Sequence, residues 1–263
     1  MSTTLTDVAL YLRRLGHDQP PAPTLATLRT LQARHTAAFP FETLSTLLQL
    51  PVPLDLPSIE RKLLHDGRGG YCYELNRLFL ALLHTLGFDA RAIAARVLMG
   101  EAEDAVPART HLLVLATVDG ERHIVDVGFG GMVPTAPLRL DTEAVQSTPH
   151  EPYRITRHGD QYTLLAQVAG QWRRLYVFDL QPQAEIDHLL APLGAGGGLR
   201  AAGQPGFVVG VPPQLHLLRR AARHGRDVDH RASECTAGSL VVAFGRDGCG
   251  LAAIRAASMV RHA

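Results

Sequence analysis

Cys72 is the residue whose type and setting most directly indicate chemistry. It stands in the run Arg68-Gly69-Gly70-Tyr71-Cys72-Tyr73-Glu74-Leu75-Asn76, where two glycines lead into a strongly amphipathic segment of helical period. A cysteine that begins a helix lies beside unpaired backbone N–H groups and the positive end of the helix dipole, and both favour thiolate over thiol. The thiolate is the nucleophilic form, so the motif predicts an activated sulfur. The alternative is a buried cysteine that packs as a small hydrophobic side chain.

A second candidate pair follows from a predicted hairpin. Asp119-Gly120, between two apolar runs, predicts a two-residue turn of type I′. If Val118 and Glu121 flank that turn, Asp126 falls opposite Leu113 and His111 falls opposite Gly128. Side chains alternate between the faces of a sheet, so His111 and Asp126 then emerge on one face as diagonal neighbours. Their Cβ atoms should lie about 7–8 Å apart, a gap that a His–Asp hydrogen bond can close.

This pairing explains why an acid interrupts the apolar run 124–127, where an unpaired carboxylate would be costly. It would also orient the imidazole, as the carboxylate does in a nucleophile–base–carboxylate triad. Gly128, opposite His111, would leave space beside the ring. Two alternatives stay open: His111 could be an ordinary strand histidine among 13, and Asp126 could bind a loop N–H at a strand end. A metal site of Cys72, His111 and Asp126 lacks the closely spaced ligands typical of zinc, and no metal is predicted.

The elements that must position these residues follow from hydrophobic periodicity. Helices are expected near residues 8–15, after Thr24 and Ser58 as N-caps, and from Cys72 to a stop at Gly87. From about residue 91 the period changes, and strands are expected at 92–98, 111–118, 121–127, 153–156, 161–166 and 172–178. A Gly- and Ala-rich linker or loop at 193–206, a helix at 215–224 and a strand at 239–244 should follow.

Composition limits the function classes. The 263 residues are 46% hydrophobic and 19% charged, as in a folded protein, and the net charge of +1 gives no attraction to nucleic acid or anionic membranes. Three cysteines without a C-x-x-C spacing indicate neither a disulfide framework nor a zinc ribbon. With no apolar run near the roughly 20 residues of a membrane span and no signal-peptide pattern, we expect a cytoplasmic protein. Lys62, the only lysine, is expected to be a solvated surface charge.

The order Cys, His, Asp resembles the arylamine N-acetyltransferases, acetyl-CoA-dependent enzymes that share a Cys-His-Asp triad with transglutaminases and resemble papain-like proteases. The resemblance rests on the motif around Cys72, on Thr110-His111 opening a strand, and on the run 125–130, Val-Asp-Val-Gly-Phe-Gly. Tyr11–Gly16 and His35–Glu42 support it, so that about the first 140 residues are covered.

The resemblance implies an α+β fold with a cysteine-protease-like Cys-His-Asp core. Its parts would be an N-terminal helical bundle with the nucleophilic cysteine (1–90), a central antiparallel β-barrel with His and Asp (91–192), and a divergent C-terminal α/β lid (193–263). Cys72 would take the acetyl group from acetyl-CoA as a thioester in a ping-pong reaction, and an arylamine, arylhydroxylamine or hydrazine would accept it. His111 would serve as base and Asp126 would orient it.

The resemblance also implies binding residues. Phe129, Gly128, Gly130 and Thr110 would line the cleft for the acyl donor and acceptor, although a core position for Phe129 is the alternative. Arg68, Glu74 and Asn76 are expected to hold the cysteine turn through hydrogen bonds. The lid sequence departs from the family after Asp187, where Leu189-Leu190-Ala191-Pro192 leads into the Gly- and Ala-rich chain. Two other functions remain open: acyl transfer from a carrier-bound chain, as in amide synthases, and a non-catalytic binding protein on the same scaffold.

Overall fold

The computed structural model describes residues 4–48, 50–102, 104–182, 239–242 and 252–255. The chain divides into two compact units, residues 1–203 and 204–263, and each is described by itself. In the second unit, β8 (Ser239–Val242) pairs antiparallel with β9 (Ala252–Arg255), so the strand predicted at 239–244 is present over its first four residues. The predicted linker at 193–206, the predicted helix at 215–224 and most of the predicted lid lie outside the described residues. The three-domain division stays a prediction.

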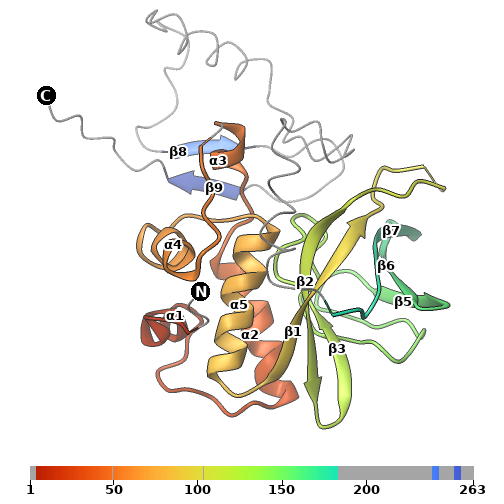
Figure 1. Ribbon diagram of the computed structural model, residues 1–263, viewed down its shortest axis with the longest axis horizontal. Coiled ribbons are helices and arrows are strands. Elements are labelled where there is room, and N and C mark those ends of the chain that lie inside the picture. Colours follow the sequence, from red (N-terminus) through yellow and green to blue (C-terminus); the bar gives the residue numbers. More distant parts are fainter. Residues whose placement is uncertain (1–3, 49, 103, 183–238, 243–251, 256–263) are drawn as a thin grey trace, which may run out of the picture. The chain divides into compact units, whose positions relative to one another are not determined.

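Before the first strand begins at Asp89, the regular structure of the described residues is helical (Figure 1). The helices are α1 (Val8–Arg14), α2 (Leu25–Ala38), α3 (Leu44–Leu47), α4 (Leu56–Glu60), the π-helical turn η1 (Arg61–His65) and α5 (Cys72–Thr85). Thr24 caps α2 as predicted, because its side-chain oxygen accepts a hydrogen bond from the Thr27 N–H at 3.2 Å. The Ser58 cap was wrong. Asp55 caps α4 instead and accepts from the Ser58 N–H at 3.0 Å, so the helix begins three residues earlier.

One antiparallel sheet forms most of the described chain between residues 89 and 182 and curls into a nearly closed barrel (Figure 1). The strand order is β4-β3-β2-β1-β7-β6-β5. The strands are β1 (Asp89–Val97), β2 (Arg109–Val118), β3 (Glu121–Val125), β4 (Leu138–Arg139), β5 (Tyr153–His158), β6 (Gln161–Val168) and β7 (Gln171–Phe178). Helices followed by an antiparallel barrel confirm this part of the predicted α+β fold. The short β4 was not predicted, because two residues carry no periodicity.

The hairpin register is confirmed. Val118 pairs with Glu121 and Val114 with Val125, and Asp119 and Gly120 both have positive φ, of 52° and 78°, as a type I′ turn requires. The predicted strand 121–127 was two residues too long, since β3 ends at Val125. Asp126 therefore lies just past the ladder, where its side chain and backbone can bind other partners.

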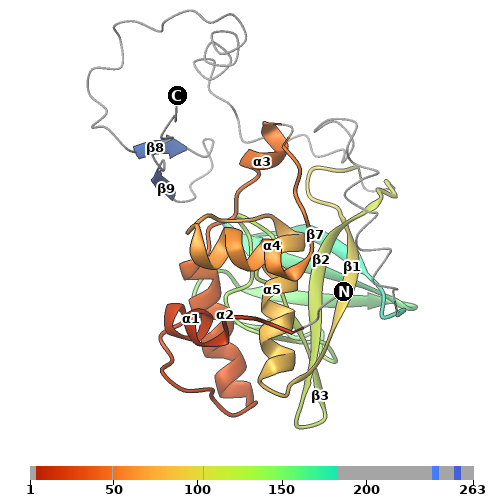
Figure 2. The same ribbon diagram turned by 60° about the vertical axis from the view of Figure 1, so that its left-hand side comes forward.

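Strand β2 divides its side chains between two cores. Val114, Ala116 and Val118 face the helices, whereas Leu113 and Leu115 face the inside of the curled sheet. The helix side contains the fully buried Leu75, Leu78, Phe79 and Leu82 of α5, which confirms the predicted apolar face of that helix. Figure 2 shows α5 lying against β1 and β2, so the buried helix face fixes where its first residue, Cys72, meets the sheet.

Candidate active site

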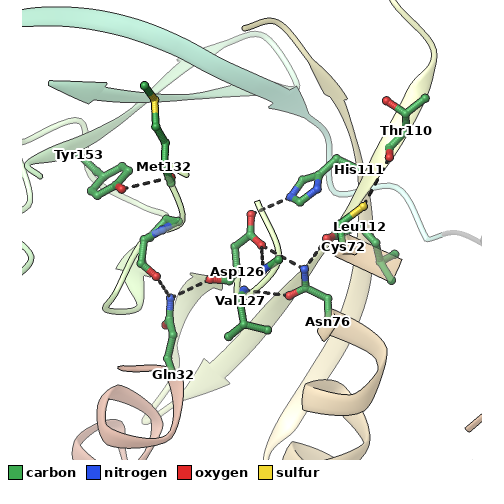
Figure 3. Close-up of polar contacts among 12 residues, drawn as sticks. Gln32, Cys72, Asn76, Thr110, His111, Leu112, Asp126, Val127, Met132 and Tyr153 are labelled. Atoms are coloured by element: carbon green, nitrogen blue, oxygen red, sulfur yellow. Dashed lines mark hydrogen bonds and ion pairs between the residues drawn. The ribbon is translucent and has the colours of Figure 1, made fainter. Parts of the chain in front are cut away.

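Cys72 is the first residue of α5, as predicted, and it is 8% exposed. The helix begins there because Glu74, at its third position, accepts a hydrogen bond from the Tyr71 N–H at 3.1 Å. The thiol packs beside Leu112 and Tyr73, and Sγ lies 3.7 Å from the Thr110 carbonyl oxygen (Figure 3). The nucleophile candidate is thus held at the helix start, next to the beginning of β2.

A β-bulge at the beginning of β2 sets this contact. Ala95 of β1 pairs with His111, and Arg96 pairs with Arg109, so Thr110 is left outside the ladder. Its carbonyl oxygen is then available to Cys72 rather than to a neighbouring strand. Bulges occur often beside active sites because they redirect single groups in this way.

His111 and Asp126 are joined directly. His111 Nε2 donates to Asp126 Oδ2 at 2.7 Å, and the two residues are 2% and 0% exposed (Figure 3). The predicted contact between these side chains is therefore confirmed. With Nε2 committed to Asp126, Nδ1 is the ring nitrogen left to exchange a proton with Cys72.

The electrostatics of the pair favour charge on both partners. Burial lowers the pKa of His111, but the Asp126 carboxylate and the Cys72 side chain more than compensate and raise it to about 10. Burial raises the pKa of Asp126, and the His111 charge, the Gly128 N–H and Asn76 bring it below its usual value. A charged imidazole on His111, next to the Cys72 sulfur, would attract the negative charge of a thiolate and so favour it.

Asn76 contributes more than the sequence indicated. Its Nδ2 donates to Asp126 Oδ1 at 3.0 Å and to the Leu112 carbonyl at 2.7 Å, and its Oδ1 accepts from the Val127 N–H at 3.1 Å (Figure 3). The expectation that Asn76 holds the cysteine turn was wrong, because its bonds go to β2 and to the segment after β3. One turn beyond Cys72, it ties the helix to the carboxylate.

Gln32 of α2 supports Asp126 from the other side. Its Nε2 donates to the carbonyls of Asp126 at 3.2 Å and Pro134 at 2.6 Å (Figure 3). Sequence reasoning missed this residue. The available signal was a polar side chain four residues after Leu28 on the apolar side of α2, where burial requires a partner.

Position 128 needs a glycine because the backbone of Cys72 lies against it, and not because the His111 ring needs space. A Cβ at this position would lie 2.8 Å from the Cys72 Cα and 2.7 Å from Asn76 Nδ2. The predicted space beside the imidazole is therefore taken up by the start of α5. Gly130 has φ of 82°, in the left-handed region, and turns the chain away after Phe129.

Phe129 is 6% exposed and belongs to the core inside the sheet. Its ring meets the His111 ring edge-on at 5.1 Å and the Tyr176 ring at 5.0 Å. Tyr176, fully buried and 5.0 Å from the imidazole, was not identified from the sequence. These rings form an apolar wall around His111, and a role for Phe129, Gly128, Gly130 or Thr110 in substrate binding stays a prediction.

The turn before Cys72 is held by charged side chains, as predicted for Arg68 and Glu74. Arg68 Nη2 donates to Glu42 Oε1 at 2.7 Å, and Lys62 Nζ donates to Glu74 Oε1 at 2.7 Å. The expectation of a solvated Lys62 was wrong, since its side chain is only 15% exposed and pairs with two carboxylates. No group of three or more His, Cys, Asp or Glu side chains within the described ranges is arranged to hold a metal ion.

A cysteine at a helix start, set beside a buried His–Asp pair, is an arrangement that can support nucleophilic catalysis by a thiol. Comparison with known proteins then gives the family. Residues 24–191 match the family model described as N-acetyltransferase. The arylamine N-acetyltransferase of Mycolicibacterium smegmatis is 46% identical over 185 residues, which make up 69% of this chain and 67% of that protein. This chain belongs to the arylamine N-acetyltransferase family.

Other relatives define how far the similarity extends. The arylamine N-acetyltransferase / N-hydroxyarylamine O-acetyltransferase of Salmonella typhimurium is 44% identical over 181 residues, 68% of this chain and 64% of that protein. The matched segments thus span about two thirds of these relatives. The Mycobacterium marinum enzyme, solved in complex with CoA, has a TM-score of 0.70 and 40% identity, covering 74% of this chain and 73% of that one. Proansamycin X synthase of Amycolatopsis mediterranei is 33% identical over 185 residues, 69% of this chain and 70% of that protein.

Within the described residues, no helix combines the length and the apolar character that crossing a lipid bilayer requires.

Proposed function

We propose that this protein transfers an acetyl group from acetyl-CoA to an arylamine, an arylhydroxylamine or a hydrazine through a thioester on Cys72. The observation that carries the proposal is the buried His111–Asp126 hydrogen bond of 2.7 Å beside a cysteine that begins a helix. The CoA complex of the M. marinum relative and the names of the relatives at 44–46% identity support the donor and the acceptor class.

The first half-reaction consumes the thiol proton. His111 Nδ1 holds the proton that Cys72 has given up, and the thiolate attacks the thioester carbonyl of acetyl-CoA. The carbon–sulfur bond to CoA breaks, the new one to Cys72 forms, and the CoA sulfur leaves with the proton from His111. Asp126 keeps the imidazole oriented and stabilises its charged form, while Asn76 and Gln32 hold Asp126.

In the second half-reaction the acceptor nitrogen attacks the acetyl carbonyl on Cys72. His111 takes the proton that the nitrogen loses and returns it to the departing sulfur, so the resting enzyme is restored. Because CoA leaves before the acceptor attacks the thioester on Cys72, the kinetics should be ping-pong. The reaction needs no metal, no nucleic acid and no membrane, and it needs a free thiol, so we place it in the reducing cytoplasm.

Intact-protein mass spectrometry tests the proposal. Mixing with acetyl-CoA should add one acetyl group to the protein and release CoA, and adding an arylamine such as anisidine should remove that group and give the amide. Cys72→Ser should give neither product at the wild-type rate. A Cys72→Ser protein that acetylated the amine normally would contradict the role of Cys72.

Acyl transfer from a carrier-bound chain is the second candidate, and we consider it because a relative of 33% identity, proansamycin X synthase, is named as a synthase rather than as an acetyltransferase. It uses the same Cys72 chemistry but a different donor. A protein that stays unmodified by acetyl-CoA yet becomes acylated by a longer acyl thioester of a pantetheine analogue would support this candidate over the first. A non-catalytic protein would remain unmodified by both donors.

A further inference from the structure

Four charged side chains, two buried carboxylates and two partly exposed cations, cluster behind the helix start that carries Cys72. Lys62 Nζ lies 2.7 and 2.9 Å from the two Glu74 carboxylate oxygens and 3.3 Å from Glu42 Oε1. Arg68 binds the same Glu42 oxygen at 2.7 Å. The two carboxylates are only 5% and 2% exposed for Glu42 and Glu74, so water screens them little. Lys62 comes from η1, next to α4, which lies against α5 (Figure 2).

Glu74 has two opposing effects on Cys72. Its carboxylate accepts from the Tyr71 N–H at 3.1 Å and so holds the residue directly before Cys72. The same negative charge occupies the helix start and opposes a thiolate there, because like charges repel more strongly where water is excluded. Burial raises the pKa of Glu74, and Lys62, the Tyr71 N–H and their hydrogen bonds counteract that rise. Lys62 therefore keeps the cap ionised and also cancels its charge.

We propose that Lys62 is an electrostatic positioning residue for Cys72: by neutralising Glu74 and Glu42, it lets a carboxylate cap the helix without opposing the thiolate. The side chain of Lys62 binds Glu74 and Glu42, and it acts on Cys72 through Glu74. The inference rests on the proposed function, in which Cys72 reacts as a thiolate.

Other charged and titratable groups also face this region and are kept constant in the test. They come from the start of α5, from β2, from the segment after β3 and from the loops before α3 and α5: Tyr71, Tyr73, Arg77, His111, Asp126, Glu42 and Arg68. The His111 side chain interacts with Cys72 directly, because the Cys72 side chain is among the groups that raise the pKa of His111. Lys62 is expected to add a smaller, separable contribution.

The experiment measures the rate of Cys72 alkylation by iodoacetamide against pH, with the modified residue identified by peptide mass. It uses the full chain without acetyl-CoA, so it does not depend on acetyl transfer. The variants are Lys62→Met, Lys62→Arg, Glu74→Gln and the double variant Lys62→Met/Glu74→Gln. Arg61→Met is the matched control, because it removes one positive charge from the exposed neighbouring residue of η1. Thermal unfolding is recorded for each variant.

Lys62→Met should move the midpoint of the pH profile upward, with a roughly three- to tenfold loss of rate on its acidic limb. Lys62→Arg and Arg61→Met should leave the midpoint near that of the wild type. In the double variant the midpoint should return most of the way to the wild-type value, because the Glu74 charge that Lys62 cancels is then absent. This should hold even if Lys62→Met is less stable. An unchanged midpoint in Lys62→Met, or an equal shift in the Glu74→Gln background, would overturn the proposal. If Cys72 of the wild type reacted only as an ordinary thiol above about pH 8, the proposed function itself would fail.

Discussion

The geometry of this site depends on the polar groups that bind Asp126. Asp126 is fully buried, and a buried carboxylate is tolerated only when its oxygens are bound. His111, the Gly128 N–H and Asn76 provide those bonds. Asn76 also binds the Leu112 carbonyl of β2 and the Val127 N–H that follows β3. It therefore fixes the distance between α5 and the strand pair.

Asn76→Ala should therefore cost catalysis more than stability. The variant removes the Asn76 partner of the Val127 N–H and one of the two hydrogen bonds to Asp126 Oδ1, which should lower the free energy of unfolding by about 1–3 kcal/mol. It should lower kcat/KM for acetyl transfer at least tenfold, because His111 loses its fixed orientation. Steady-state kinetics and urea unfolding on the same samples check both values. A normal kcat/KM in a folded variant would contradict the positioning role.

Gly128→Ala tests the close approach to Cys72. An added methyl group would lie within 2.8 Å of the Cys72 Cα, so the start of α5 or the segment 126–130 must move. We expect a tenfold or greater loss in the rate of Cys72 acetylation by acetyl-CoA. This rate is measured in a stopped-flow instrument as the release of CoA. Gly131→Ala is the matched control, because a Cβ there meets nothing within 4 Å and should leave the rate unchanged. Equal rates in both variants would show that the contact is not limiting.

At the scale of elements, the site lies where two helices and a strand pair meet. Helix α5 presents Cys72 and Asn76, α2 presents Gln32, and the hairpin β2–β3 presents His111 and Asp126 (Figure 3). The bulge at Thr110 and the end of β3 at Val125 release backbone groups from the ladder at the two positions that face α5. Secondary structure is thus interrupted where the candidate catalytic side chains converge.

Gln32→Ala should loosen the segment 126–134 without unfolding α2. Its Nε2 is the described donor to the Pro134 carbonyl, so amides 127–133 should exchange hydrogen faster in mass-spectrometric measurements. A loss of about three- to tenfold in kcat/KM should accompany this change. Arg29→Ala, exposed on the same helix, is the control and should alter neither quantity. Unchanged exchange in Gln32→Ala would refute the anchoring role.

At the scale of the whole molecule, two buried histidines give stability opposite dependences on pH. His35 lies among Tyr11, Phe39 and Phe79, and Nδ1 shares a hydrogen bond of 2.7 Å with the Tyr11 hydroxyl. Burial lowers the pKa of His35 to about 3, whereas that of His111 is raised. The folded protein therefore keeps one imidazole neutral and the other charged at neutral pH.

The free energy of unfolding should be greatest near pH 6.5 and fall on both sides. Below pH 6.5 the unfolded chain binds a proton at His35 that the folded chain refuses down to about pH 3, so stability should fall by up to about 1.4 kcal/mol per pH unit. His111 contributes its full stabilisation below the pKa that it has in the unfolded chain. That stabilisation is lost as the pH rises toward the pKa of His111 in the folded protein. Urea unfolding between pH 4 and 9 checks the profile. His35→Gln should flatten only the acidic limb and His111→Gln only the alkaline limb, and limbs that persist in these variants would exclude this cause.

The local sequence determined the elements and the pairing of the reactive residues. Apolar spacing placed α5, Gly87 stopped it, and Asp119-Gly120 fixed a register that brought His111 to Asp126, because a two-residue turn leaves one alignment of its strands. The tertiary structure alone decided which groups hold that pair. Asn76, Gln32, Lys62 and Tyr176 take their roles from residues 12 to 102 positions away or from another element, and such contacts leave no period in the sequence. Gly128 shows the same limit. The sequence indicated that a small residue is needed there, but the neighbour that requires it, Cys72, follows only from the packing of α5 against the sheet.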